Sequence, residues 1–214
     1  MSPIEIAAEL RRDILSGRMI PGSNLPQEDL AQRYGVSRIP VRDALNLLAA
    51  EKLVRIRPNR GACVIRFTRA ELAEAFSLRI MLESDCLRRA VPFIDDHAMK
   101  RIAQAARRCE VEADQEDFHE HDWDFHRALY EPANRQMQLA LIGELRRACQ
   151  VHVAAYDRLR QERKRFSTDH AAILAACQKG DSETAVSQLR THLERAARSL
   201  DTILKRAAEQ PGQA

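Results

Sequence analysis

The sequence predicts a mainly α-helical protein, in which three short helices and a β-hairpin precede an all-α bundle of about six helices. Two features of the composition favour this class. Only 5% of the 214 residues are aromatic and only 7 are glycine, whereas the good helix formers Ala, Leu, Arg and Glu are frequent. A third observation is the periodicity of the apolar residues, which is helical along most of the chain and changes to short β-branched runs only at residues 53–67.

The first three helices follow one another closely. Residues 4–16 place apolar side chains at mostly helical spacing, and Gly17 ends this pattern. After the turn MIPGSNLP, a second short helix, EDLAQRY, ends at Gly35, and a third helix begins directly after it. The order helix, turn, helix, glycine-containing turn, helix is the helix-turn-helix arrangement.

The third helix, within GVSRIPVRDALNLL at residues 35–48, has the properties of a helix that reads a DNA groove. Arg38 and Arg42 are four residues apart and share one face, whereas apolar residues recur at helical spacing on another face. Pro40 falls in the first turn after the cap residue Ser37, where its missing N–H has no partner within the helix. We expect contacts with DNA from Ser37, Arg38, Ile39, Pro40 and Arg42.

A β-hairpin with a basic tip follows. The strand-like runs at 53–57 and 62–67 flank the turn Pro58-Asn59-Arg60-Gly61. An ordinary solvated hairpin is the alternative, but directly after an arginine-bearing helix the hairpin is better explained as a wing. Residues 1–67 are therefore predicted to form a winged helix-turn-helix domain. The wing would bring phosphate or minor-groove contacts from Arg57, Asn59, Arg60 and Gly61.

The distribution of charge agrees with a DNA-binding N-terminal domain. The formal net charge is +3, and residues 1–66 hold 11 Lys and Arg against 7 Asp and Glu, whereas the rest of the chain is nearly balanced. The positive excess thus lies in the segment that would release counterions from phosphates. An excess of four charges is mild and would prove nothing alone.

The sequence also indicates in which cellular compartment the protein is expected. No run approaches the roughly 18 apolar residues of a membrane span, and the N-terminal MSPIEIAAELRRDIL is charged and amphipathic, unlike a signal peptide. We expect a cytoplasmic protein without a membrane partner. Five single cysteines without a CxxC pair indicate buried thiols, with a redox sensor as the alternative; they are Cys63, Cys86, Cys109, Cys149 and Cys177.

Helical patterns alone continue from residue 68 to about residue 206. They are broken at 92–96, around 132–134 and at 180–181. We expect a bundle of about six helices. A bundle of this size can bury a core of its own. We therefore place an all-helical domain at 68–206 and expect a frayed tail at 207–214.

A possible metal site lies in the helical domain. Asp122 and His126 are four residues apart, so that a helix projects a carboxylate and an imidazole from the same face. His170 and His192 lie on the next two helices, and antiparallel packing of these helices would place both beside one cavity. One carboxylate and three imidazoles suit Zn, Ni, Mn or Fe.

Two other interpretations of these helical residues stay open. A histidine in a helical core is more often a hydrogen-bonded structural residue than a ligand, and His119, His121 and His152 are competing candidates. Arg79 precedes Glu83 by one turn, which is typical of a surface salt bridge. It could instead point into the bundle and hold a carboxylate with its guanidinium fork.

A resemblance to a known family strengthens the interpretation of these residues as a metal site. Residues 22–64, from GSNLPQEDLAQRYGVSR to RIRPNRGACV, closely resemble the DNA-binding domain of GntR-superfamily bacterial transcription regulators, whose pattern runs PGs.L.E..LA..lgVSR.PVReAL..L...GLv...p.rG..V. The remainder resembles the FCD ligand-binding domain of the FadR subfamily. Its marks are R.mLE at 79–83, the spacing of Asp122 and His126 with Asn134 following, and the pair His170 and His192.

The resemblance implies that Asp122, His126, His170 and His192 hold a divalent metal ion. It also implies that a small carboxylate effector binds beside the metal, with Arg79 and Asn134 as the effector-binding residues. Two residues depart from the family pattern: Ile39 replaces the usual Thr, and Lys52 stands where Gly is common. These departures leave the fold unchanged but affect the expected operator sequence and the turn into the wing.

Together these observations predict a dimeric DNA-binding regulator. We expect a repressor whose two winged domains bind a palindromic operator and which a small organic acid releases. A metal-sensing regulator is the main alternative. A metal-dependent hydrolase or lyase would need a base beside the metal, for which Glu120 or Asp124 could be nominated. Because their spacing singles out neither residue, we expect that the protein is not an enzyme.

Overall fold

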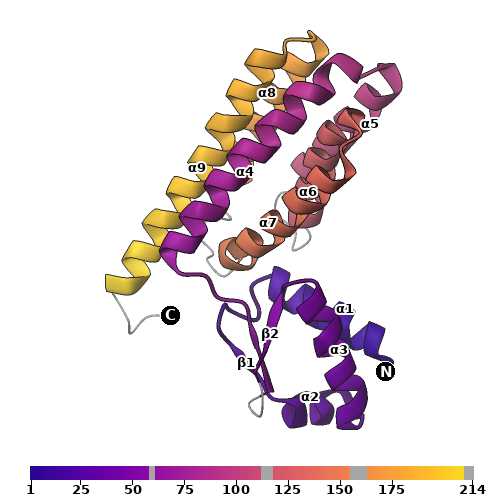
Figure 1. Cartoon of the computed structure of the whole chain (residues 1–214), viewed down its shortest axis with the longest axis vertical. Coiled ribbons are helices and arrows are strands. Elements are labelled where there is room, and N and C mark those ends of the chain that lie inside the picture. The colour runs from indigo at the N-terminus through magenta and orange to yellow at the C-terminus, as the bar shows by residue number, and fades with distance from the viewer. Residues whose placement is uncertain (58–60, 112–117, 155–162, 210–214) are drawn as a thin grey trace. The chain divides into compact units, whose positions relative to one another are not determined.

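The chain is mainly helical, as predicted, and forms two compact units (Figure 1). This computed structural model describes residues 1–57, 61–111, 118–154 and 163–209, without the side chains of 163–167 and 206–209. The first unit comprises residues 1–68 together with the end of helix α7 (Gln136–Ala154) from Arg147 onward. The other described residues belong to the second unit.

The first unit contains the three predicted helices, α1 (Pro3–Leu15), α2 (Gln27–Tyr34) and α3 (Arg38–Ala50). Helix α1 begins with a capping box, because Ser2 Oγ accepts a hydrogen bond from the Glu5 N–H and the Glu5 carboxylate accepts one from the Ser2 N–H. Helix α2 ends at Gly35, which has the left-handed φ of 63° that glycine adopts without a steric penalty.

A three-stranded antiparallel sheet completes this unit, in the order β1-β3-β2. The predicted hairpin is confirmed by β2 (Val54–Arg57) and β3 (Gly61–Val64), in which Arg57 pairs with Gly61. Strand β1 (Asn24–Leu25) also pairs with β3. It was not predicted, because two residues are too short to show an alternating pattern. The tip of the wing at 58–60 lies outside the described residues.

The end of α7 packs in the core of the first unit. Val151 is fully buried in the same apolar cluster as Leu10, Leu45 and Leu48. The ring of His152 uses both nitrogens: Nε2 accepts a hydrogen bond from the Phe67 N–H at 2.9 Å, and Nδ1 lies 3.0 Å from the Ala148 carbonyl. His152 is therefore a structural histidine of the first unit.

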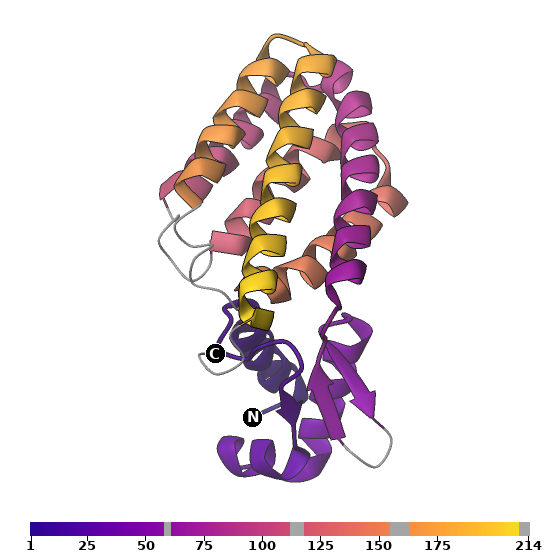
Figure 2. The same cartoon turned by 90° about the vertical axis from the view of Figure 1, so that its left-hand side faces the viewer.

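Six α-helices make up the described part of the second unit, and three of the connections between them lie at the predicted breaks. The other two, at 112–117 and 155–162, were not predicted and lie outside the described residues. Helix α9 packs against both α4 and α8, and Figure 2 shows it between these two; helix α5 packs against α6 and α8. Helix α9 extends through the first residues of the predicted tail, and 210–214 lie outside the described residues. The elements are α4 (Arg69–Ala90), η1 (Val91–Phe93), α5 (Asp96–Val111), α6 (Phe118–Tyr130), η2 (Glu131–Ala133), α7, α8 (Arg163–Gln178) and α9 (Ser182–Glu209).

The five cysteines are all buried, as predicted, and none is in a disulfide. Burial raises the pKa of the Cys86 and Cys177 thiols to about 11. These two thiols therefore stay protonated near neutral pH, which is the state expected of cysteines that pack as small apolar side chains.

Lys52 has a backbone conformation that favours glycine. It follows the C-cap Glu51 of α3 with a φ of 59°. The Leu53 N–H donates to the Leu48 carbonyl and the Lys52 N–H to the Ala49 carbonyl, at 3.0 Å each. This pair of hydrogen bonds is the Schellman motif, whose left-handed position usually holds glycine. The turn into the wing thus keeps its geometry although a lysine occupies it.

Replacing Lys52 with glycine is expected to raise the free energy of unfolding by about 0.5–1 kcal/mol. The left-handed conformation costs a residue with a side chain roughly 1–2 kcal/mol, and the greater freedom of glycine in the unfolded chain offsets part of this gain. Urea denaturation of the full chain measures the change. Lys52→Ala is the control, since it removes the side chain and keeps the strained backbone. An equal gain from Lys52→Ala would show that backbone strain is not the cause.

Candidate functional site

Helix α3 presents a basic face to solvent and an apolar face to the core. Arg38 and Arg42 are exposed, Ile39 is 63% exposed, and Val41 and Leu45 are completely buried. Ser37 occupies the N-cap position with an extended backbone, but its side chain makes no capping hydrogen bond. Pro40 is the third residue of the helix and does not interrupt it.

The wing lies next in the chain and adds further positive charge. Arg55 and Arg57 on β2 are exposed, and Arg57 Nη1 donates to Asn24 Oδ1 at 3.4 Å. Gly61 has a φ of 75°, and a Cβ atom there would lie 3.4 Å from the Leu25 carbonyl oxygen. The predicted contacts of Asn59 and Arg60 fall outside the described residues.

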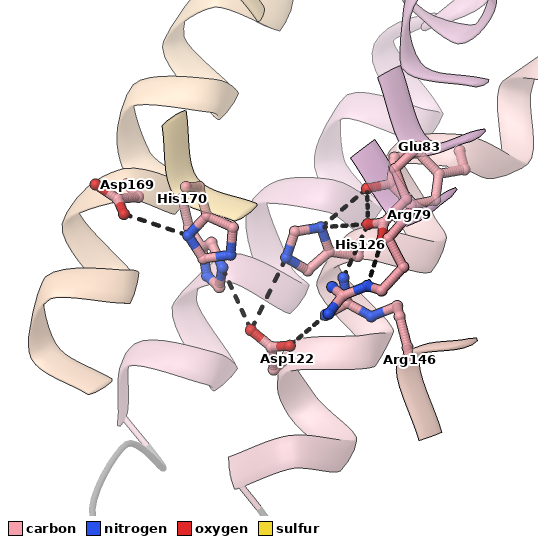
Figure 3. A network of polar contacts seen from close by, with 9 residues as sticks. Arg79, Glu83, Asp122, His126, Arg146, Asp169 and His170 are labelled. Carbon is pink, nitrogen blue, oxygen red and sulfur yellow. Dashed lines mark hydrogen bonds and ion pairs between the residues drawn. The ribbon is translucent and has the colours of Figure 1, made fainter. Parts of the chain in front are cut away.

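In the second unit, the four predicted ligands come together from three helices. Asp122 and His126 project from α6, His170 from α8 and His192 from α9. Each offers a ligand atom, and these atoms all lie within 4.8 Å of one another. The three imidazole rings surround one point, with ring centroids 5.0–5.3 Å apart. Figure 3 shows Asp122, His126 and His170 facing one another.

Some nitrogens in this cluster lack the partners that buried polar atoms normally have. His126, His170 and His192 are 0%, 1% and 5% exposed. Among the described residues, neither His126 Nε2 nor either nitrogen of His170 has a hydrogen-bond partner. Leaving such an atom unsatisfied costs about 1–3 kcal/mol. The donor set therefore fits a bound cation, which would use the lone pair of His126 Nε2 and that of the unprotonated nitrogen of His170.

Neighbouring side chains orient two of the rings. The Tyr130 hydroxyl donates to Glu83 Oε2 at 2.7 Å, so its oxygen is free to accept from His126 Nδ1 at 3.1 Å. His192 Nδ1 lies 3.2 Å from Asp169 Oδ2, which can only accept. Both histidines thus carry their proton on Nδ1 and leave Nε2 as a ligand atom, as is usual in metal sites.

Two arginines lie beside the cluster, the buried Arg79 and the partly buried Arg146, and only Arg79 was predicted from the sequence. Arg79 Nε donates to Glu83 Oε1 at 2.8 Å; the predicted i,i+4 pair exists, but it is buried instead of solvated. Arg146 on α7 joins Asp122 to Glu83, with Nη1 2.9 Å from Glu83 Oε2 and Nη2 bonded to the Asp122 carboxylate (Figure 3). The sequence around Arg146 contains no motif that would have distinguished it from the neighbouring arginine.

The charges in this network bias its protonation. Burial alone would raise the pKa of Asp122, but Arg146 and the nearby histidines hold it well below its usual value. Burial, together with Arg146, lowers the pKa of His126 well below its usual value, and burial lowers that of His192. An ionised carboxylate beside neutral imidazoles is the state that binds a divalent cation.

The other predicted residues lie apart from this cluster. Asn134 is exposed at the end of η2, where it has a left-handed φ of 50° and its N–H donates to the Glu131 carbonyl. His119 and His121 are partly exposed on α6, and His152 belongs to the first unit. Glu120 and Asp124, the nominated bases, are exposed on α6.

Comparison with known proteins identifies both halves of the chain. Residues 4–64 match the model for bacterial regulatory proteins of the gntR family, and residues 74–195 match the FCD domain. The HTH-type transcriptional repressor RspR of Escherichia coli strain K12 is 30% identical over 198 residues, which cover 91% of this chain and 86% of that protein. The chain belongs to the GntR family.

Two further relatives support this GntR-family assignment. The gluconate operon transcriptional repressor of Bacillus licheniformis is 26% identical over 199 residues, covering 89% of this chain and 82% of the relative. The crystal structure of a GntR regulator from Rhodococcus sp. RHA1 matches with a TM-score of 0.79 and 25% identity, covering 92% and 96% of the two chains.

The GntR-family protein is thus a transcription regulator with an FCD domain, and the expectation that it is not an enzyme is confirmed. Within the described residues, no helix is both long and apolar enough to span a membrane.

The lowered histidine pKa values predict that acid destabilises the metal-free protein. Below pH 6.5, the usual histidine value, the unfolded chain takes up protons that the buried rings do not. The free energy of unfolding should therefore fall as the pH drops from 7.5 to 5.5. His126→Gln should reduce this slope by up to about 1.4 kcal/mol per pH unit. Urea denaturation in the presence of a chelator measures it.

The control is His97→Gln, which changes an exposed histidine on α5 and should leave the slope unchanged. Equal slopes in the wild type and His126→Gln would contradict the role of burial.

Proposed function

We infer that the protein is a homodimeric repressor that binds a palindromic operator. It would dissociate from this operator when a small carboxylate binds near a divalent metal ion. In this proposal residues 1–67 form the DNA-binding domain and 68–206 the effector-binding and dimerisation domain. The names of two relatives, both repressors, support the sign of regulation. Membership of the FadR subfamily and a cytoplasmic location stay predictions.

The observation that carries the proposal is the cluster of ligand atoms around Asp122, in which His126 Nε2 and both nitrogens of His170 have no hydrogen-bond partner among the described residues. Three imidazoles and one carboxylate would hold Zn, Ni, Mn or Fe, all of which accept this donor set. The bound ion would supply positive charge and coordination positions that the protein leaves open. Asp169 and Tyr130 would keep His192 and His126 in the tautomer that the ion requires.

The arginines beside the cluster support an anionic effector. Arg79 and Arg146 both approach Glu83, so two guanidinium groups share one buried carboxylate. Because a guanidinium fork can bind a carboxylate through two parallel hydrogen bonds, either group could turn part of its fork to an effector. Asn134 stays a predicted contact, although its exposed position gives it no support.

Regulation requires that the effector distinguish two arrangements of the protein. An acid that bound the DNA-competent and DNA-incompetent forms equally would change nothing. One observation favours the alternative of a metal-sensing regulator: Arg146 pairs with Asp122, the carboxylate that the metal would use. In that case metal binding itself would rearrange the network.

Arg38→Ala is expected to weaken operator binding by about 1–3 kcal/mol. The exposed guanidinium at the start of α3 would lose its contact with a base edge or a phosphate. A gel shift at fixed salt measures the loss. Arg12→Ala removes an exposed arginine from α1 and should bind like the wild type. Unchanged affinity of Arg38→Ala would remove this residue from the proposed interface.

Asp122→Asn is expected to lower zinc affinity at least tenfold, because the amide loses the negative charge that the cation needs. Calorimetric titration of chelator-treated protein measures this. In the wild type loaded with zinc, a small acid from a panel that includes gluconate should raise the Tm and release operator DNA. Asp122→Asn should show neither response.

Asp124→Asn changes an exposed carboxylate on the same helix and serves as the matched control. Release of the operator by zinc alone would favour the metal sensor over the acid-responsive repressor. If metal removal left both DNA binding and the acid response intact, the cluster would be structural.

A further inference from the structure

Ile39 is an apolar side chain in a place that calls for polar ones. It lies in the first turn of α3, between the exposed residues Arg38 and Arg42, and is itself 63% exposed. Single exposed apolar residues are ordinary on protein surfaces. Ile39, however, lies on the helix whose exposed arginines are proposed to read DNA. The group that Ile39 would contact can therefore be inferred from the chemistry of the DNA groove.

The helical geometry places Ile39 at the outermost position of α3. Leu48, which is completely buried, follows nine residues later, about two and a half turns, and therefore points to the opposite side. Asn46 follows Ile39 by seven residues, about two turns, and is exposed on the same side. A helix that enters a groove with Arg38 and Arg42 therefore brings Ile39 to the floor of that groove.

The charges around Ile39 favour a polyanion over an apolar protein partner. Within the described chain no acidic group pairs with Arg38, and Arg42 pairs only with the adjacent Asp43, at 3.4 Å between largely exposed side chains. A partner with an apolar docking surface would have to desolvate both guanidinium groups without compensation. DNA phosphates neutralise them instead.

The floor of the major groove offers few partners for an isoleucine. Its base edges carry hydrogen-bond donors and acceptors, apart from the C5 methyl group of thymine. Ile39 can neither donate nor accept, so contact with a polar edge would strip water from it without replacing the hydrogen bond. Contact with the methyl group has no such cost and buries apolar surface.

We propose that Ile39 selects a thymine in each operator half-site by packing against the thymine methyl group. The inference rests on the proposed DNA-binding mode and adds a rule of sequence preference to it. Arg38 and Arg42 would position the helix and read polar groups, whereas Ile39 would read the presence of one methyl group. Asn46 lies on the same face and would contribute a polar contact deeper along the helix.

Replacing thymine by uracil tests this rule, because it removes only the methyl group. The operator is first selected from random duplexes with the full-length protein. Each thymine of a half-site is then replaced singly by deoxyuridine, and affinity is measured at fixed salt. At one thymine per half-site the wild type should lose about fourfold in affinity, the factor that corresponds to burying one methyl group.

Variants assign the loss to Ile39. Ile39→Ala should bind the thymine and uracil duplexes equally, whereas Ile39→Val, which keeps the branch at Cβ and is shorter by one methylene, should retain most of the difference. Ile4→Ala removes an exposed isoleucine from α1 and should behave like the wild type. Tolerance of uracil at every position, or a loss that persists in Ile39→Ala, would overturn the inference. If no duplex is selected, the DNA-binding proposal itself fails.

Discussion

The pairing of the buried Glu83 carboxylate and the partly buried Asp122 carboxylate with arginines is the constraint on which the second unit depends. Glu83 is completely buried, and Arg79, Arg146 and Tyr130 all bond to it. Burial alone would raise its pKa, but the two arginines hold the pKa below its usual value. Removing one partner from a buried ion pair typically costs 3–5 kcal/mol. The helices that supply these groups, α4, α6 and α7, are therefore fixed relative to one another.

The histidine side chains, unlike the carboxylates, have only some of their polar atoms hydrogen-bonded. The outward nitrogens of His126 and His192 are satisfied by Tyr130 and Asp169. His126 Nε2 and both nitrogens of His170 have no hydrogen-bond partner within the described chain. A network that served only stability would be expected to satisfy its inner atoms as well. This arrangement fits the proposed cation site, in which Tyr130 and Asp169 would orient two of the ligands.

In the first unit, helix α3 also combines a buried face, which fixes its position, with an exposed face that can bind a partner. One face of α3 supplies completely buried residues such as Leu45 and Leu48, and the opposite face carries Arg38, Ile39 and Arg42. Because the buried face holds the helix firmly, the exposed side chains can meet DNA from a rigid base. The left-handed Lys52 then turns the chain sharply from α3 into β2, which leads to the wing.

Most of the helices, the hairpin and part of the candidate site follow from local features of the sequence. Helical periodicity, β-branched runs and turn residues act over a few residues, so the helical class, the hairpin and three of the breaks between helices could be predicted. The spacing of Asp122 and His126 placed both on one face for the same local reason.

Local features could not predict three other aspects of the structure. These are the strand β1, the pairing of Arg146 with Asp122 and of Asp169 with His192, and the packing of the end of α7 in the first unit. The meeting of His170 and His192 with the α6 pair was expected on the assumption of antiparallel packing and on resemblance, and the tertiary structure decided it. The physical reason is that local periodicity fixes which face a side chain occupies, whereas only packing between distant helices fixes what that face meets.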